Sequence, residues 1–455
     1  MKRFLITTLA EYQTAFWLKV GLQLRKQGHE AAFISFDDRS TEMLQQAGLQ
    51  VFSATQVDVS SQSFDSVMQK YGIDQLNFWF GHERFAFGLH DSTELQRKLL
   101  VALEAASQAC TTFGEKGPFM MVQELGGFLS VIGSYFAARN QGINNYFIEP
   151  SFFRGRLFYI QNSFKALSIS DSSNDEIPRA VQDYLQDTVS KSTIVVPQKD
   201  KHQYTTAWKK IVNVRNAKRL AQKVVDKYLL GKRQEFGYIG GYVATHARML
   251  WSSFRLRGSY SSLTDCGQFV YYPLHVPGDM ALTLRTPHLL DQLALVDFIC
   301  RSVPHTHTVV FKEHPAMVGA IDSARVLALL KKHDNLKLLR PSTNNYEVLK
   351  KTDLVVSINS KSGAEALLLD KQVIALGDAF YTHCPLVQYV ANLKDLPQTI
   401  ASNLAGRHIA RTEEGIQRYF AKVWEHTVAG ELYVAEDSSV DNFTQGMLQA
   451  LEGRE

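Results

Sequence analysis

Several short apolar runs of this sequence are followed at once by residues that suit binding or attack at an anionic group. The run 354–358 leads directly into Ser360, Ser362 and Gly363 and then into a stretch of helix formers. Free backbone N–H groups and a partial positive charge at a helix start favour a phosphate there. Helix capping explains the same residues, with Ser360 or Ser362 as N-cap and Glu365 closing a capping box. Spacing alone leaves both interpretations open.

A second segment, Lys312-Glu313-His314-Pro315, follows the apolar run 308–311. Lys312 and His314 alternate with Glu313, so they point to the same side of a strand, and Pro315 ends the strand. A lysine and a histidine at the carboxyl end of a strand suit an anion. Considered alone, however, the segment favours the simpler alternative of a strand end emerging into solvent.

Two further loops carry carboxylates. The run 269–272 is followed by a Pro/Gly loop with His275 and Asp279. An aspartate before a helical stretch is most often an N-cap, and as a catalytic group it is a carboxylate nucleophile or base. The run 145–148 is followed by Glu149 and Arg154, which either face an interdomain cleft or form a local salt bridge.

The elements that must position these residues alternate between strand and helix. Hydrophobic patterning predicts strands at 4–7, 31–36, 120–123, 145–148, 269–272, 308–312, 336–339, 354–358 and 372–376, and helices that include 16–27, 287–300, 323–333 and 364–369. Such alternation through both halves of 455 residues predicts an α/β protein with two Rossmann-like domains facing a cleft. Ligands bind such sheets at the carboxyl ends of the strands.

We place the domain boundaries where the composition changes. The predicted units are an N-terminal Rossmann-like domain at 1–197, a basic helical segment and linker at 198–264, a C-terminal Rossmann-like domain at 265–412, and helices at 413–455 that cross back to the first domain.

Several classes of protein are excluded or disfavoured by what the sequence lacks. It has no GxGxxG after the first strand, no P-loop, no Asp-x-Asp after a strand and no GxSxG. The four cysteines are scattered without zinc-ligand spacing, and no run reaches the length of a membrane-spanning helix. We therefore expect a reduced, cytoplasmic protein, at most peripheral at the inner membrane, with no metal site. Metal-independent glycosyltransferases with two Rossmann-like domains (the GT-B arrangement) match this pattern.

The order of these segments resembles the bacterial capsule polysaccharide biosynthesis family. That family shows Pro-x-Gln-x-x-x-Asp, Lys-x-His-Pro and Ser-x-x-Gly-x-Glu-Ala segments, which correspond here to 273–279, 312–315 and 360–366. Its Glu-x-Gly-Tyr-x-Arg-Pro segment is similar to the one from Glu149 to Gly155. This chain differs at His275, where the family has Gln, at Ser151, where it has Gly, and at Gly155, where it has Pro.

The resemblance implies a retaining β-Kdo transferase that uses CMP-Kdo as its donor substrate and needs no cofactor. It implies that 1–197 is the acceptor-side domain and that 265–412 is the nucleotide-sugar-binding domain. It implies Asp279 as the nucleophile and Glu149 as the acid/base, in two displacements like those of retaining glycosidases. The residues that would hold the donor are His275, Lys312, His314, Ser360, Ser362, Gly363, Glu365 and Arg154. Among them, Arg154 would pair with the carboxylate of the donor sugar.

Two alternatives remain open at this point. The same fold with another nucleotide sugar, such as a UDP-sugar or CMP-sialic acid, is one of them. The other is a non-catalytic component of capsule assembly, against which the presence of both Asp279 and Glu149 argues. A lipid-linked or oligosaccharide acceptor fits either enzymatic reading.

The net charge of +4, from 49 basic and 45 acidic residues, conceals a basic block. Residues 199–257 hold 14 Lys/Arg and three acids, a local charge of 14 − 3 = +11, interleaved with aromatic residues. Such a segment suits an anionic membrane surface, or it is a solvated helical face around the domain linker. The small net charge disfavours nucleic acid as a partner.

Overall fold

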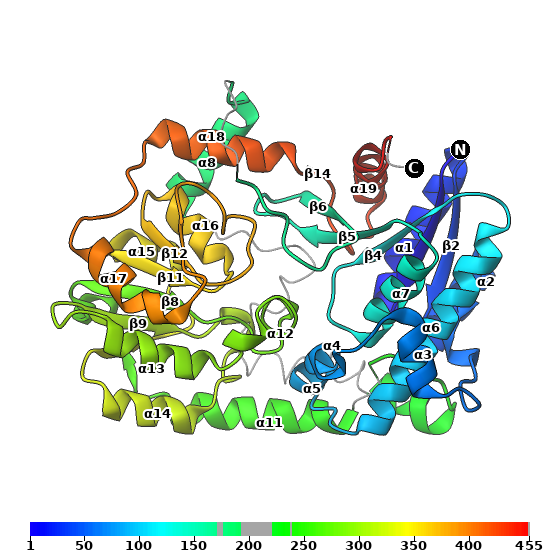
Figure 1. Cartoon of the computed structure of the whole chain (residues 1–455), viewed down its shortest axis with the longest axis horizontal. Helices are drawn as coiled ribbons and strands as arrows, with labels where there is room; N and C mark the ends of the chain where they lie inside the picture. Colours follow the sequence, from blue (N-terminus) through cyan, green and yellow to red (C-terminus); the bar gives the residue numbers. More distant parts are fainter. Residues whose placement is uncertain (171–175, 193–220, 237–238, 454–455) are drawn as a thin grey trace.

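Two seven-stranded sheets with helices on their faces build the molecule (Figure 1). The computed structural model describes residues 1–170, 176–192, 221–236 and 239–453. The first sheet has the order β14-β6-β5-β4-β1-β2-β3 and the second the order β13-β12-β11-β8-β9-β10-β7. All pairings in the second sheet are parallel, and in the first only β5–β6 and β6–β14 are antiparallel. The predicted α/β fold with two Rossmann-like domains in a GT-B-like arrangement is confirmed.

The strands are short and mostly buried. They are β1 (Arg3–Thr8), β2 (Glu30–Ser35), β3 (Gln50–Ser53), β4 (Met120–Glu124), β5 (Asn145–Pro150), β6 (Arg156–Gln161), β7 (Tyr260–Ser261), β8 (Phe269–Pro273), β9 (Thr308–Lys312), β10 (Leu336–Leu339), β11 (Leu354–Ser357), β12 (Gln372–Ala375), β13 (Gln388–Tyr389) and β14 (Val428–Ala429).

The helices lie between the strands in the sequence. They are α1 (Glu11–Lys26), α2 (Asp38–Gln46), α3 (Phe64–Tyr71), α4 (Leu76–Trp79), α5 (Gly81–Phe87), α6 (Ser92–Gly114), α7 (Leu129–Asn140), α8 (Arg179–Lys191), α11 (Ile239–Arg255), α12 (Met280–Thr283), α13 (Gln292–Ser302), α14 (Ser323–Lys332), α15 (Asn345–Lys351), α16 (Lys361–Leu368), α17 (Leu396–Leu404), α18 (Glu413–Glu425) and α19 (Asp437–Ala450).

Alternation along the strands assigns each sheet face to its own layer of helices. In the first sheet, Phe4 and Ile6 of β1 pack with α1 and α19, whereas Leu5 packs with α6 and α7. In the second sheet, Tyr272 of β8 joins the cluster that contains α13, and Tyr271 joins the one that contains α16. Because both faces are covered, these strands read as continuous apolar runs in the sequence.

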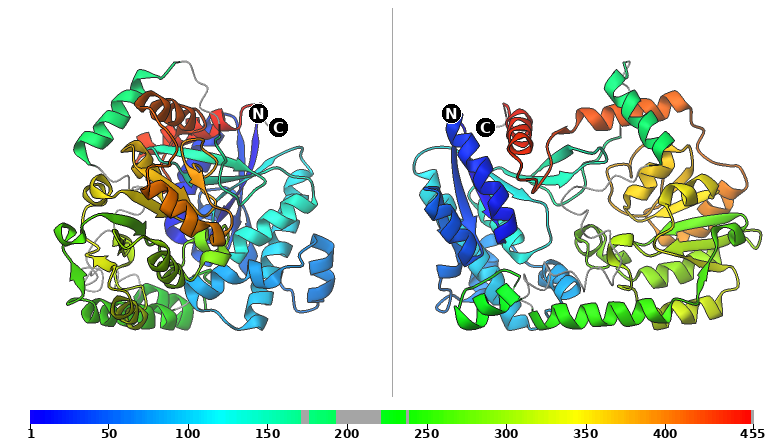
Figure 2. Two further views of the ribbon diagram at one scale, coloured as in Figure 1. Left: turned by 60° about the vertical axis from the view of Figure 1, so that its left-hand side comes forward. Right: turned by 180° about the vertical axis from the view of Figure 1, so that it is seen from behind.

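The end of the chain returns to the first domain. After α18, which packs against α8 and α16, β14 pairs antiparallel with β6, and α19 packs on α1. Gly446 of α19 makes this possible, because a Cβ there would lie 1.9 Å from the carbonyl oxygen of Ala429. Both views of Figure 2 show α19 beside the N-terminal strand and helix.

The predicted strands agree with observed ones within a residue or two, but five strands were not predicted: the edge strands β3, β7, β13 and β14, and β6, which lies between β14 and β5. Of the predicted basic segment, residues 199–220 lie outside the described residues. Within the described residues of this segment, 221–229 form a short helix that includes η3 (Val225–Leu229) and is tied to the first domain by the ion pair of Asp226 with Arg39, and Ile239–Arg255 form the long helix α11. Among the described residues, no helix is long and apolar enough to cross a membrane.

Candidate active site

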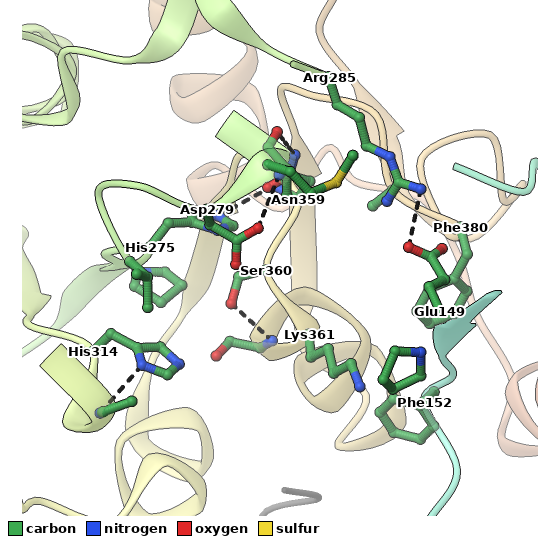
Figure 3. A pocket seen from close by; sticks show the side chains of 18 of the residues that line it. Glu149, Phe152, His275, Asp279, Arg285, His314, Asn359, Ser360, Lys361 and Phe380 are labelled. Carbon is green, nitrogen blue, oxygen red and sulfur yellow. Dashed lines mark hydrogen bonds and ion pairs between the residues drawn. The ribbon is translucent and has the colours of Figure 1, made fainter. Parts of the chain in front are cut away.

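One cavity of about 450 Å³ receives residues from both domains. The first domain contributes the ends of β4 and β5, and the second contributes the loops after β8, β9 and β11 together with the start of α16. Figure 3 shows His275 and Asp279 on one side, Glu149 and Phe152 on the other, and Lys361 between them. Eight of the ten residues predicted from the sequence line this cavity, and Arg154 and Gly363 do not.

The wall where the domains meet is aromatic. Phe152 and Phe158 of the first domain lie 6.2 and 5.9 Å, centroid to centroid, from Phe380 of the second. Phe152 also lies 4.9 Å from Phe420 of α18. This buried contact belongs to a hydrophobic cluster that extends into both domains, so it fixes one side of the cavity by packing rather than by a flexible linker.

The helix start after β11 is built as the sequence suggested, and capping and cavity lining coincide there. Ser360 is the N-cap of α16, and its hydroxyl accepts a hydrogen bond of 3.2 Å from the amide of Ser362. The Ser360 carbonyl in turn accepts a 2.6 Å bond from the hydroxyl of Tyr381. Ser360, Lys361 and Ser362 all line the cavity. The first turn of α16 therefore faces the space where an anion would lie.

Gly363 has a packing role instead of a lining one. A Cβ at this position would lie 2.4 Å from the hydroxyl oxygen of Tyr381, closer than real contacts allow. The glycine therefore lets Tyr381 reach the carbonyl of Ser360 and hold the loop. Gly363 was expected among the donor-binding residues, but it is not one of the residues that line the cavity.

The loop after β9 brings Lys312 and His314 to the cavity together with the buried Glu313. The ammonium group of Lys312 donates a 2.8 Å hydrogen bond to the carbonyl of Thr343, and burial lowers its pKa to about 8. The Nδ1 of His314 accepts a 3.3 Å bond from the amide of Ala316. In the neutral ring the proton then sits on Nε2, which makes that atom a hydrogen-bond donor.

Glu313 shapes the loop that follows. Its carboxylate accepts a 3.0 Å hydrogen bond from the amide of Gly319, and burial raises its pKa to about 7. It is thus held by the backbone of the second-domain loop rather than by solvent.

The loop after β8 places His275 in the interior and Asp279 at the surface of the cavity. Asp279 is the N-cap of α12 and accepts a 2.9 Å bond from the amide of Ala281. His275 accepts a 3.4 Å bond at Nε2 from the amide of Asn359. Burial lowers the pKa of His275 to about 4, against the opposing effect of Asp279, so its ring is neutral. The capping role of Asp279 leaves its second oxygen available to the cavity.

Glu365 is buried behind the start of α16. It accepts a 2.6 Å hydrogen bond from the side-chain amide of Asn345, which also donates to Ser362 over 3.0 Å. The hydroxyl of Tyr271 donates to the oxygen of the same amide over 2.9 Å. Burial raises the pKa of Glu365 to about 7. The sequence analysis missed Asn345, which lies at the start of α15 and has no local signal.

Glu149 is the penultimate residue of β5 and meets a cation that the sequence analysis also missed. The guanidinium of Arg285, which follows α12, lies 3.0 Å from the Glu149 carboxylate. Arg285 is held in place by a 2.9 Å hydrogen bond from Nε to the carbonyl of Phe164. A second cation of the second domain also contacts the first domain. The ammonium group of Lys361 donates a 2.7 Å hydrogen bond to the carbonyl of Ser151. Two cations of the second domain thus reach across the cavity to the first.

Arg154 lies elsewhere. It is exposed in the turn between β5 and β6, beside Asp183 and Asp187 of α8, and its backbone amide donates to the hydroxyl of Tyr184 over 2.8 Å. Gly155 in this turn has φ of +70°, a conformation that proline cannot adopt. The expectation that Arg154 faces the cleft beside Glu149 is therefore not met, and Arg285 takes that place.

Among the described residues, no three His, Cys, Asp or Glu side chains are grouped so that they could hold a metal ion. The cavity instead offers Lys312, His314, Lys361, Arg285 and the helix start of α16 as positive or donor groups. Four exposed or half-buried carboxylates line the cavity, namely Glu124, Glu149, Asp279 and Asp378. Of these, Asp279 and Glu149 lie on opposite walls and are the candidates for nucleophile and base.

Comparison with known proteins identifies the family of this chain. The chain is 35% identical over 121 residues to Protein FixF of Sinorhizobium fredii, an alignment that covers 26% of this chain and 29% of FixF. It is similar to two Thermosulfurimonas dismutans structures. The KpsC β-Kdo 2,7 transferase has 16% identity and a TM-score of 0.37, over 76% of this chain and 89% of that one. The KpsC β-Kdo 2,4 transferase has 14% identity and a TM-score of 0.31, over 66% and 78%.

The finding that decides the family is a match to a family model. The model of the family described as capsule polysaccharide biosynthesis protein matches residues 133–389, a range that holds nearly all the cavity residues. This is more than half of the 455 residues, and the protein therefore belongs to the capsule polysaccharide biosynthesis family.

Proposed function

We propose that the protein is a glycosyltransferase of bacterial surface polysaccharide assembly that transfers Kdo from CMP-Kdo with retention of configuration. The observation that carries the proposal is the presence of Asp279 and Glu149 on opposite walls of one cavity, each from a different domain. Membership of the capsule family and the family's characterised Kdo transferases support the choice of donor.

Retention needs two inversions at the anomeric carbon. In the first, a carboxylate oxygen of Asp279 forms a bond to that carbon while the bond to the CMP phosphate breaks, and CMP leaves with the electron pair. In the second, the acceptor hydroxyl attacks the same carbon, its proton passes to Glu149, and the bond to Asp279 breaks. The carboxylate of Asp279 is regenerated, and the proton is later lost from Glu149 to solvent.

The leaving phosphate needs positive groups where its charge develops. Lys312, the Nε2–H of His314 and the amides at the start of α16 are on one side of the cavity and suit this role. A lysine whose pKa is about 8 is mostly charged at neutral pH. The donor carboxylate of Kdo suits Arg285 or Lys361, since both cations already reach into the cavity.

Trapping the covalent intermediate tests the proposal. The protein is incubated with a CMP-Kdo-generating mixture without acceptor, and its intact mass is measured, followed by peptide mapping. We expect one Kdo-sized adduct on the peptide that contains Asp279 and none in Asp279→Asn. An adduct on another residue, or transfer by Asp279→Asn at the wild-type rate, contradicts the mechanism.

The donor is tested separately by nucleotide binding. We expect CMP to raise the thermal unfolding temperature more than UDP at equal concentration, because binding to the folded state alone stabilises it. A larger shift with UDP contradicts the Kdo assignment and favours a UDP-sugar, while leaving the glycosyltransferase proposal in place.

A further inference from the structure

Large apolar side chains are exposed mainly in one region of the molecule. Seven of the eleven in the described part of the chain fall in two short stretches, namely Val224, Val225, Tyr228, Leu229 and Leu230 in the first, and Trp251 and Phe254 in the second. The first stretch contains the five-residue turn η3 (Val225–Leu229), and the second is the C-terminal half of α11. Figure 1 shows both segments along the lower edge of the molecule, the first under the first domain and α11 extending from there under the second domain to α14, so the C-terminal half of α11 lies at the far end of this edge.

The exposure of these residues is large. Leu229 is 77% exposed, and Trp251 and Phe254 are 61% and 60% exposed. The rings of Trp251 and Phe254 stack with centroids 6.1 Å apart and an interplanar angle of 25°, so they form one exposed aromatic pair. Each of the two stretches is a local group of exposed apolar residues, and such groups mark an interaction site more often than scattered single residues do.

The exposed charged residues of α11 and of the turn just after it are all basic. Arg248, Arg255 and Arg257 are exposed on or just after α11. The guanidinium of Arg257 lies 5.6 Å from the ring of Phe254, and the ammonium of Lys227 lies 5.7 Å from the ring of Tyr228.

The only two acids in residues 221–257 turn inward. Asp226, whose side chain is 3% exposed, pairs with Arg39 at 2.6 Å. Glu235, whose side chain is 8% exposed, pairs with Lys98 at 3.1 Å. Their charges therefore anchor the segment to the first domain and do not offset the exposed arginines. We call this surface, formed by 224–230 and the exposed residues of 248–257, the basic-aromatic face.

The opposite side of α11 is committed to the second domain. Met249, Ser252 and Leu256 are buried, and Gly319, in the loop after β9, has φ of +84° and packs so closely that a Cβ would lie 2.0 Å from the carbonyl oxygen of Met249. Since α11 is fixed by this contact, the exposure of Trp251 and Phe254 is a property of the folded molecule.

We propose that the basic-aromatic face docks on an anionic lipid bilayer. Tryptophan and tyrosine favour the interface between water and lipid, and arginines beside them are attracted to anionic headgroups. A surface that is apolar, aromatic and positive, with its acids withdrawn, complements such a bilayer in both charge and polarity. This inference deepens the proposed function, because a lipid-linked acceptor would lie in that bilayer.

Vesicle sedimentation with the full chain tests the proposal. The probes are vesicles of equal parts phosphatidylcholine and phosphatidylglycerol, and vesicles of phosphatidylcholine alone. We expect the protein to bind the anionic vesicles at low salt, to bind the neutral ones at least about tenfold more weakly, and to be released by high salt. The readout requires no transfer activity, so it stands apart from the test of the proposed function.

Two pairs of matched variants locate the contact. Trp251→Ala with Phe254→Ala, and Arg255→Glu with Arg257→Glu, are each expected to weaken binding at least about tenfold. The controls change exposed residues elsewhere: Tyr12→Ala with Tyr389→Ala for the aromatic pair, and Arg179→Glu with Lys191→Glu on α8 for the charge pair. The controls are expected to bind like the wild type.

Three results would overturn the proposal. They are failure of the wild type to bind anionic vesicles at low salt, equal binding to neutral vesicles, and equal loss of binding in the control variants. A dimer that is lost in Trp251→Ala with Phe254→Ala, without vesicle binding by the wild type, would assign the face to a second copy of the chain instead.

Discussion

The guanidinium of Arg285 and the carboxylate of Glu149 meet across the cavity, with 3.0 Å between Nη2 and Oε2. Arg285 follows α12 in the second domain, and Glu149 is the penultimate residue of β5 in the first. Their side chains are only 8% and 19% exposed, so the pair is shielded from most of the solvent. The proposed acid/base is therefore positioned by the domain that carries the proposed nucleophile.

We predict that Arg285 and Glu149 act as a unit. Arg285→Met leaves a half-buried carboxylate without its cation and should reduce transfer by roughly 10²-fold, as expected when a proton-transfer group is misplaced. A double-mutant cycle with Glu149→Gln should show a coupling of about 1–3 kcal/mol in the activation free energy. The measurement is kcat/KM for the four proteins.

The control for this cycle is Arg418→Met, which removes an exposed i,i+4 pair with Glu414 on α18. Its effect on stability should be at most about 1 kcal/mol, because exposed ion pairs contribute little. Additive effects of Arg285→Met and Glu149→Gln would show that the ion pair is a packing feature without a role in transfer.

A second prediction separates the two roles of Asp279. Asparagine caps helices about as well as aspartate, so Asp279→Asn should keep the free energy of unfolding within about 0.5 kcal/mol of wild type while lowering transfer by roughly 10⁴-fold. Asp91→Asn, at the N-cap of α6 and outside the cavity, is the matched control and should leave both quantities unchanged. An equal loss of stability and activity in Asp279→Asn would mean that the cap is the main role.

A third prediction concerns Gly363, which leaves room for the Tyr381 hydroxyl beside the start of α16. A Cβ at 2.4 Å from the Tyr381 hydroxyl cannot be accommodated without displacing the ring. Gly363→Ala should lower the free energy of unfolding by about 1–3 kcal/mol and weaken CMP binding, because the Ser360 carbonyl loses its partner. Gly258→Ala, where no atom lies within 4 Å of the added Cβ, should be neutral. Wild-type CMP affinity in Gly363→Ala would separate this packing from the ligand site.

A fourth prediction follows from the buried Glu365. Its pKa is raised from 4.5 to about 7 by burial, so the folded chain binds more protons than the unfolded chain between these values. Its contribution to stability is therefore complete below pH 4.5 and is lost as the pH rises through 7. We expect the stability of wild type relative to Glu365→Gln to fall by about 3 kcal/mol across that range, measured by urea unfolding.

His82 provides a control for which the change of stability with pH has the opposite sign. It is buried in α5 against Thr283, with 2.9 Å between Nδ1 and Oγ1, and burial lowers its pKa from 6.5 to about 4. Here the unfolded chain binds more protons, so stability relative to His82→Asn should rise as the pH rises from 4 to 6.5. The same slope for both variants would contradict the assigned protonation of one of them.

Much of the site was predictable because its residues follow buried strands. Phe269–Pro273, Thr308–Lys312 and Leu354–Ser357 are uniformly apolar until their last residues, and parallel strands bring such ends to one edge of a sheet. The short strands β7, β13 and β14 escaped prediction because two residues are too few to show a period.

By itself, the sequence determined the two α/β domains and the order of the strand-end segments that carry Asp279, Lys312, His314 and Ser360. Only the tertiary structure decided which side chains meet across the cavity. Arg285 reaches Glu149, Lys361 reaches Ser151, and Arg154 turns away toward α8. Local patterns fix the direction of a side chain within its own element, whereas a contact between domains depends on how two independently folded sheets pack against each other.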